Sequence, residues 1–184
     1  MKLAWYGAGT VVGAVALSLV AATLEAQAVR LSLGGGVSIP TGSYGRNDND
    51  GWHVLGAAVA SSPIPNLAFR VDGMYSVTPH QGFSNGHTKI GGGTASVLFR
   101  LSRTGPNLRP YVLTGIGYYD VTTTAQALPS TSRSALAWSG GGGLAVLGLG
   151  PAIGFVEARY LTIRTSGTPT NLFPVTLGLV FGTR

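Results

Sequence analysis

The chain carries few residues whose chemistry could support metal binding. His53, His80 and His87 fall in or beside predicted polar loops, and Asp48 and Asp50 lie close to His53 in the sequence. Histidine and aspartate are common metal ligands, but this spacing matches no compact metal site. We therefore expect neither a metal nor a cofactor.

The polar segment Arg46–Gly51 (RNDNDG) is similar to the beginning of a calcium-binding loop. Arg46 occupies the position that needs an acidic ligand, and Ala57 stands where the closing glutamate belongs. We expect this segment to form Asx turns instead of a calcium site.

Hydrolytic chemistry is the other possibility that the residue types raise. A hydrolase needs a serine, a histidine and an acid on neighbouring strands. Serines are numerous, but no histidine has an obvious serine partner on its own predicted face, and no acid follows at a suggestive spacing. We expect that the protein is not an enzyme.

The predicted strands contain two pairs of an arginine and an acid that we expect to lie together. Arg70 and Asp72 lie two residues apart in one predicted strand, and Glu157 and Arg159 lie two apart in another, so each pair shares a face. Asp72 lies five residues after Leu67, where its predicted strand begins, and Glu157 lies five residues after Ala152. The two strands, third and seventh of eight, would oppose each other in a barrel. We predict a salt-bridge cluster that closes the lumen; the alternative is four separately hydrated charges.

The segment that carries Arg70 and Asp72 sets the pattern for the whole chain. In Leu67–Val77 (LAFRVDGMYSV), residues 67, 69, 71, 75 and 77 are apolar or aromatic, and Arg70 and Asp72 lie on the other face. Similar segments recur, and together they predict eight strands of about ten residues, the length that crosses a bilayer when tilted. The strands are Val29–Ile39, Trp52–Ala60, Leu67–Val77, Thr88–Leu101, Arg109–Tyr119, Ala135–Leu147, Ala152–Thr162 and Phe173–Phe181.

The connections between these strands alternate between long and short. Long polar loops are predicted at Pro40–Gly51, Thr78–His87, Asp120–Ser134 and Ile163–Leu172, and short turns at Ser61–Asn66, Ser102–Leu108 and Gly148–Pro151. Outer-membrane barrels have short periplasmic turns and longer outside loops. Aromatic residues are expected to form two girdles. One lies beside the long loops (Trp52, Tyr75, Tyr118, Tyr119, Trp138, Tyr160 and Phe173), and one near the turns (Phe69, Phe99, Tyr111 and Phe181).

The first residues are typical of a segment that is removed during export. Lys2 precedes the apolar run Leu3–Ala22, and Ala26-Gln27-Ala28 is a small-x-small cleavage site. We predict a signal peptide at residues 1–28 and a barrel at 29–184. An uncleaved membrane helix is the alternative, since Leu3–Ala22 is long enough to span.

The composition favours a membrane protein over a soluble or nucleic-acid-binding one. Of the 184 residues only 10% are charged, 29 are glycine and none is cysteine. A small exported domain without disulfides needs another source of stability, and a closed barrel in lipid provides one. The net charge of +6 comes from arginines and lysines that are scattered singly along the chain. We expect them to contact anionic lipid headgroups instead of nucleic acid.

Several strands resemble those of a known family. Arg109–Tyr119 looks like the fifth strand of eight-stranded outer-membrane β-barrel proteins, the class of outer membrane protein A. Gly140–Leu147, Phe155–Tyr160 (FVEARY) and Pro174–Phe181 (PVTLGLVF) are similar to that class's last three strands. The family usually ends on an aromatic residue that the barrel-assembly machinery reads. Here Phe181 is followed by Gly182-Thr183-Arg184, so an internal Gly178-x-x-Phe181 pattern would have to serve.

These observations lead to one interpretation and two alternatives. We expect an all-β, eight-stranded antiparallel up-and-down transmembrane β-barrel in the cell outer membrane, with a structural or surface-interaction role. Its expected partners are outer-membrane lipid and lipopolysaccharide, the assembly machinery and an extracellular partner that contacts the loops. The alternatives are a lipid-acting outer-membrane enzyme of the deacylase type and a soluble lipocalin-like carrier of a small apolar ligand.

Overall fold

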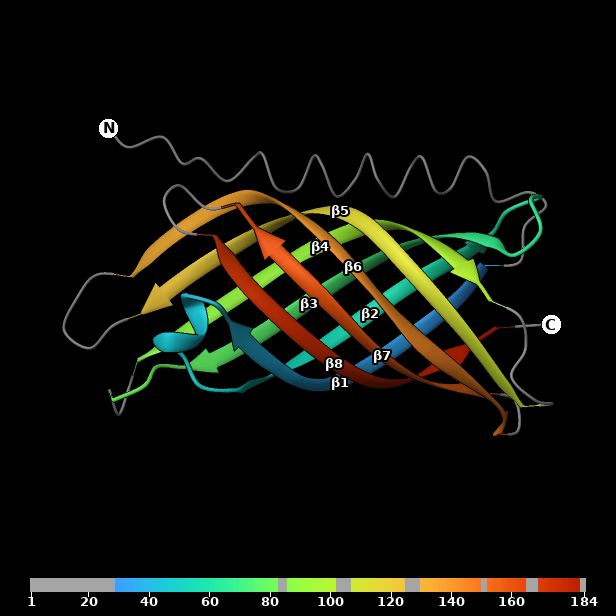
Figure 1. The fold of residues 1–184 in the computed structure, drawn as a ribbon, viewed down its shortest axis with the longest axis horizontal. Helices are drawn as coiled ribbons and strands as arrows, with labels where there is room; N and C mark the ends of the chain where they lie inside the picture. Colours follow the sequence, from blue (N-terminus) through green and yellow to red (C-terminus); the bar gives the residue numbers. More distant parts are fainter. Residues whose placement is uncertain are drawn as a thin grey trace, which may run out of the picture.

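The protein folds as one closed barrel of eight antiparallel strands joined in chain order. The computed structural model describes residues 29–82, 86–101, 107–124, 130–149, 152–164 and 169–182. Strand β8 pairs with β1, so no sheet edge is left open (Figure 1). The predicted fold class is confirmed. The strands are β1 (Val29–Thr41), β2 (Gly51–Ser61), β3 (Leu67–Pro79), β4 (His87–Arg100), β5 (Leu108–Thr124), β6 (Thr131–Leu149), β7 (Ala152–Ile163) and β8 (Thr170–Phe181).

The helical content of the described residues is one short 3-10 helix, η1 (Tyr44–Arg46), between β1 and β2. In this part of the chain no helix has the length and apolar character needed to cross a membrane. The predicted signal peptide, residues 1–28, lies outside the described residues.

The largest differences from the predicted strand boundaries are in the hairpin of β5 and β6. Asp120–Ser134 was predicted as a loop, and this was wrong for both of its ends. Strands β5 and β6 stay paired as far as Thr123 and Thr131, so only residues 125–130 connect them. Threonine is favoured in strands, and polarity alone does not end a strand that projects into water. A similar but smaller error affects 163–172, because Ile163 ends β7 and Thr170 begins β8.

The two ends of the barrel differ in their connections. We call the end with connections 42–50, 80–86, 125–130 and 164–169 the loop end. The opposite end, with connections 62–66, 101–107 and 150–151, is the turn end, where β1 begins and β8 ends. In Figure 1 the loop end is on the left.

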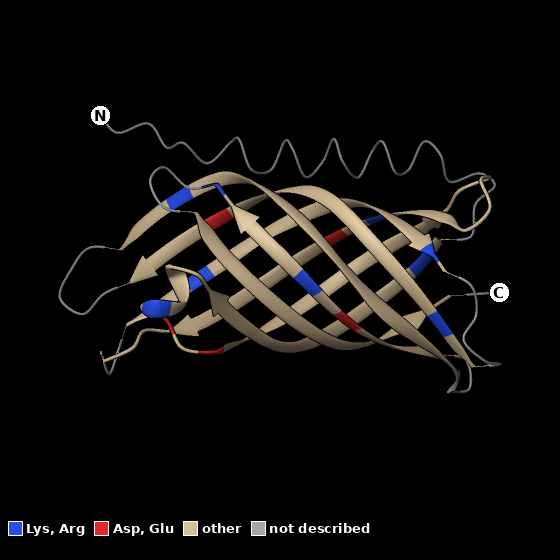
Figure 2. Cartoon of the chain, in the orientation of Figure 1, with Lys and Arg blue, Asp and Glu red and all other residues tan. Residues whose placement is uncertain are grey.

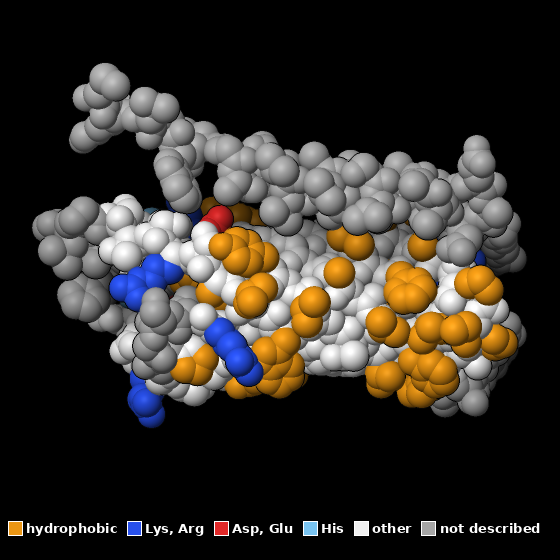
Figure 3. All heavy atoms as spheres, turned by 90° about the horizontal axis from the view of Figure 1, so that it is seen from above, with side chains coloured by type: hydrophobic (Ala, Val, Ile, Leu, Met, Phe, Trp, Pro, Cys, Tyr) orange, Lys and Arg blue, Asp and Glu red, His pale blue; other side chains and the backbone are white. Residues whose placement is uncertain are grey.

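Apolar side chains cover the outside of the barrel wall. Leu33, Val71, Val97 and Leu177 point outward, with exposed fractions from 40% to 66%. Figure 3 shows apolar side chains along one face of the wall and charged side chains toward the loop end. The outward side of these strands is therefore their apolar side. In β2, Trp52 and Val54 point outward while His53 and Leu55 are buried.

The inside of the barrel is filled by its own side chains in layers. An apolar layer toward the loop end contains Met74, Ile90, Tyr119, Val121, Ala137, Leu161, Ile163 and Leu172, and we call it the loop-side layer. A smaller apolar layer toward the turn end contains Ala68, Leu98, Tyr111 and Leu113, and we call it the turn-side layer. Polar and charged side chains occupy the level between them.

Candidate functional site in the lumen

The four charged residues singled out in the sequence meet in the middle of the barrel. Strands β3 and β7 lie in opposite walls of the barrel, and each contributes one arginine and one acid. Figure 2 shows their red and blue bands near the middle of the barrel's length. Each residue is buried, with at most 5% of its surface exposed. The structure therefore brings Arg70, Asp72, Glu157 and Arg159 together, and we call them the lumen cluster.

The lumen cluster is a closed ring of ion pairs. Arg70 places Nε 3.1 Å from Asp72 Oδ1 and donates through Nη1 to Glu157 Oε2 at 2.7 Å. Arg159 donates through Nε to Glu157 Oε1 at 2.7 Å and through Nη1 to both oxygens of Asp72 at 3.1 Å. Two acids and two arginines balance in charge. Each acid contacts both arginines, so the two barrel walls are linked across the lumen.

Tyr111 completes this ring and was missed in the sequence. Its hydroxyl group donates to Glu157 Oε2 at 2.8 Å from strand β5. The prediction that Tyr111 belongs to an outward aromatic girdle is wrong, because this residue is 9% exposed and lies in the turn-side layer. Both faces of β5 carry apolar and aromatic residues, so alternation does not show which face is inward.

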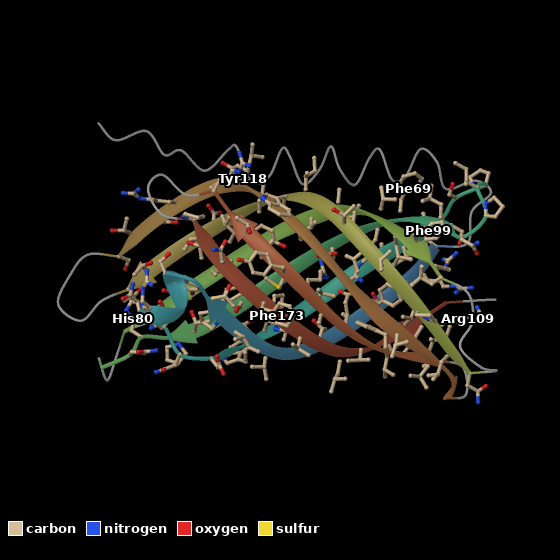
Figure 4. The ribbon with its side chains drawn as sticks, viewed as in Figure 1. Phe69, His80, Phe99, Arg109, Tyr118 and Phe173 are labelled. Atoms are coloured by element: carbon tan, nitrogen blue, oxygen red, sulfur yellow. The ribbon has the colours of Figure 1, made fainter. Side chains whose placement is uncertain are left out.

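A second aromatic placement was also wrong, for the same reason. Tyr119 lies in the loop-side layer with 1% of its surface exposed and shares a hydrogen bond of 2.8 Å with Thr94. Other expected girdle residues do point outward. Trp52, Tyr118 and Trp138 surround the loop-end side of the wall, and Figure 4 shows Phe69 and Phe99 at the turn end.

A hydrogen-bonded network lies beside the lumen cluster on the loop-end side. His53 shares hydrogen bonds with Ser38 Oγ at 3.1 Å through Nδ1 and with Thr176 Oγ1 at 2.8 Å through Nε2. Ser76 donates to Ser38 at 2.8 Å. His53 lies beside the β1–β2 connection, as expected, but the expectation that it has no serine partner was wrong. Strand register brings Ser38 of β1 diagonally opposite His53 of β2, and that register is not visible in either segment alone.

This network does not form a catalytic triad in the described part of the chain. The second nitrogen of His53 meets the Thr176 hydroxyl and not a carboxylate, and Ser38, His53 and Ser76 are each at most 1% exposed. A nucleophilic serine needs both an oriented base and access to substrate. The network instead satisfies polar groups that the barrel buries.

A third polar group closes the loop end of the barrel. The connection between β1 and β2 folds over this end, where Tyr44 shares a 2.5 Å hydrogen bond with Thr78 and Thr78 donates to Asp48 at 3.3 Å. His80 Nε2 lies 3.6 Å from Asp48 Oδ1. The segment is anchored further by backbone hydrogen bonds from Asn49 to Pro79 and from Gln81 to Asn47, each 2.8 Å.

Burial dominates the electrostatics of this loop-end group. It raises the pKa of Asp48 above its ordinary value, although the charge of His80 acts in the opposite direction. Burial also raises the pKa of Tyr44 to about 12, so its hydroxyl group stays protonated at physiological pH. Figure 4 places His80 at this end. His87 is the first residue of β4, and no group of three or more potential metal ligands occurs among the described residues.

No protein-family model and no curated protein sequence matches the chain. Solved structures do match it. Neisserial surface protein A aligns with a TM-score of 0.67 and 14% identity over 84% of this chain and 97% of that one. The N-terminal barrel domain of Pseudomonas aeruginosa OprF aligns at 0.57 and 13%, covering 85% and 97%. The outer membrane protein AlkL aligns at 0.50 and 16%, covering 86% and 90%. At these identities the similarity shows a shared fold, that of eight-stranded outer-membrane barrels.

Proposed function

We propose that this protein is a closed outer-membrane barrel with a structural or surface-interaction role, and that it is neither a channel nor an enzyme. The observation that carries this proposal is the lumen cluster between two apolar layers, inside a wall whose outside is apolar. Lipid accommodates such a wall, while the filled interior leaves no continuous aqueous path. The fold shared with outer-membrane proteins supports this location.

The loop end provides the surface for interactions in this proposal. Four exposed cations, Arg46, Lys89, Arg133 and Arg164, lie at this end. They suit contact with the phosphates of lipopolysaccharide or another anionic lipid. An extracellular partner would contact the same four connections, and the barrel-assembly machinery would insert the chain through its C-terminal strand.

The structure argues against both alternative functions on physical grounds. A soluble carrier of an apolar ligand needs a polar outside and an apolar cavity, and this barrel has an apolar outside and a charged middle. A lipid-acting enzyme needs its reactive groups at the outer rim. The Ser38–His53 pair is instead enclosed in the lumen, where a membrane lipid has no access.

Three measurements on one preparation test the proposal. Cell fractionation should place the protein in the outer membrane, and its electrophoretic mobility should change on heating, as expected for a folded barrel. Planar bilayers that contain the purified protein should show no stable conductance steps. Mass spectrometry of lipid A should be identical with and without the protein. Steady single-channel conductance would contradict the closed lumen, and a lost acyl chain would establish an enzyme.

A further inference from the structure

Arginine side chains surround a cavity at the turn end of the lumen. The cavity has a volume of about 100 Å³. Its lining includes Arg30, Arg70, Arg100 and Arg109, and no acidic residue. Arg70 belongs to the lumen cluster and faces Asp72 and Glu157. The other three lie farther toward the mouth, and we call them the arginine mouth.

The arginine mouth brings like charges together from separate walls. Arg30 is the second residue of β1, Arg100 the last of β4, and Arg109 the second of β5. Strands β4 and β5 are neighbours, while β1 and β5 oppose each other in the barrel order. The charges of both Arg30 and Arg109 act unfavourably on Arg100. Figure 2 shows blue bands without red ones at this end, and Figure 4 labels Arg109 there.

The acids of the described chain lie elsewhere. Asp48 and Asp50 are in the β1–β2 connection, Asp120 is near the loop end of β5, and Asp72 and Glu157 are engaged in the lumen cluster. Like charges around a small cavity repel one another, and an anion that enters the cavity reduces this repulsion. The described residues therefore place several arginines around one open volume.

From this geometry we infer that the arginine mouth is a binding site for a phosphate group. Guanidinium groups are planar forks that hold the oxygens of phosphate in paired hydrogen bonds. Three guanidinium groups that approach from two walls of the barrel suit a tetrahedral anion. A flat carboxylate needs only one guanidinium group to pair both of its oxygens. The cavity exceeds the roughly 10–15 Å³ needed by one water molecule, so a phosphate group with some of its hydration fits.

The same chemistry could come from two sources, free phosphate or the headgroup of a phospholipid. The remaining cavity wall is largely apolar and includes Val59, Leu98, Ile153, Phe155 and Val180. Such a wall accepts the glycerol portion of a headgroup as well as a bare ion. The inference depends only on the cavity and its arginines, so it does not require the proposed closed-barrel role.

Thermal unfolding in a phosphate-free detergent tests the site directly. The protein is purified from cells in octyl glucoside, and its unfolding midpoint is measured with sodium phosphate, with sodium chloride at equal ionic strength, or with short-chain phosphatidylglycerol. We expect phosphate or the lipid to raise the midpoint by about 3 °C or more beyond the effect of chloride. A response to the lipid alone identifies the headgroup as the source, and a response to free phosphate identifies the ion.

Two variants and one control locate the response. Arg100→Gln and Arg30→Gln should each raise the midpoint in the absence of phosphate, because they relieve repulsion, and should weaken phosphate binding at least about tenfold in a ³¹P NMR titration. Thr123→Gln, at an exposed and uncharged position near the loop end of β5, should keep the full response. The inference is overturned if neither probe stabilises the parent beyond chloride. It is also overturned if both arginine variants keep the response.

Discussion

At the scale of single residues, the charge of Glu157 is held in the barrel by its neighbours. Its two oxygens accept hydrogen bonds from Arg70, Arg159 and Tyr111, and its side chain is 1% exposed. Burying a charge is costly unless it is paired and hydrogen-bonded. The ring of ion pairs therefore contributes to folding mainly because each partner prevents the others from being left unpaired.

Removing one charge from the ring should be strongly destabilising. We expect Glu157→Gln to lower the free energy of unfolding by up to roughly 3–5 kcal/mol, because an arginine then remains buried without its acid. Asp72→Asn should act in the same direction. Equilibrium urea unfolding in lipid vesicles measures both changes. Asp50→Asn, at an exposed loop position, is the control and should stay within about 0.5 kcal/mol. Equally small changes in Glu157→Gln and Asp72→Asn would contradict a tightly paired cluster.

At the scale of elements, strand β6 makes room for the side chains of its neighbours. All four glycines of its run Gly140–Gly143 are paired in the sheet on both sides. A Cβ atom at Gly143 would lie 2.5 Å from the Tyr111 hydroxyl oxygen, whereas one at Gly140 would meet no atom within 4 Å. Alternate glycines in the run therefore have different roles, and the inward pair, Gly141 and Gly143, leaves space beside Arg159 and Tyr111.

This difference predicts opposite results for two alanine substitutions. Gly143→Ala should lower the free energy of unfolding by about 1–3 kcal/mol, because the Tyr111 hydroxyl group and the Val156 carbonyl oxygen, each 2.5 Å from the added Cβ, must move away. Gly140→Ala is the matched control and should be neutral or slightly stabilising, by up to about 1 kcal/mol, through a less flexible unfolded chain. Urea unfolding of the two variants under the same conditions compares them. Equal losses at both positions would show that the run acts only through the backbone.

The connection between β1 and β2 is the second element with a measurable property. Because burial raises the pKa of Asp48 from its ordinary value of 3.8, the folded chain binds more protons here than the unfolded chain does. The stability contributed by this residue should therefore be present below about pH 3.8 and be lost as pH rises through the raised value. Relative to Asp48→Asn, the parent should become progressively less stable over that range.

The pH dependence has an internal control in His80. Its charge favours the ionised form of Asp48, so His80→Gln should make the loss of stability with pH larger. Urea midpoints of the parent and the variants, measured from about pH 3 to pH 7, give the comparison. A parent that gains stability over Asp48→Asn as pH rises would mean that Asp48 is held as a favourable charge.

At the scale of the whole molecule, the outward apolar surface determines where the barrel is stable. Val71 lies at the middle of β3, is 40% exposed and points away from the lumen. Leu136, near the loop end of β6, is 68% exposed beyond the girdle residue Trp138. If the wall lies in lipid, these two positions differ in depth but not in facing.

Arginine substitutions at the two positions test the placement in lipid. Val71→Arg should cost about 2–4 kcal/mol, while Leu136→Arg should cost about 0–1 kcal/mol because its charge reaches the interface. Folding into lipid vesicles of both variants, followed by urea unfolding, measures the costs. If both variants fold as well as the parent, the wall is not surrounded by hydrocarbon at the level of Val71.

Local sequence determined the strands, their number and most of their facing. Alternation in segments such as Leu67–Val77 depends only on the two-residue repeat of a strand, which each segment expresses by itself. The lumen cluster could be predicted because its four charges lie at matching distances from the strand starts, and barrel order then places β3 opposite β7. The extent of the β5–β6 hairpin could not be predicted, because pairing with a neighbour, and not polarity, decides where a strand ends.

Only the tertiary structure decided which groups meet when alternation is ambiguous or when the contacts cross strands. Tyr111 and Tyr119 turned inward because β5 is apolar on both faces and its neighbours supply the space and the hydrogen-bond partners. Ser38, His53 and Thr176 meet through the register of β1, β2 and β8. Arg30, Arg100 and Arg109 are scattered singly in the sequence, yet closure of the barrel brings them to one mouth. Closure joins residues that are distant in the chain, and no local pattern encodes it.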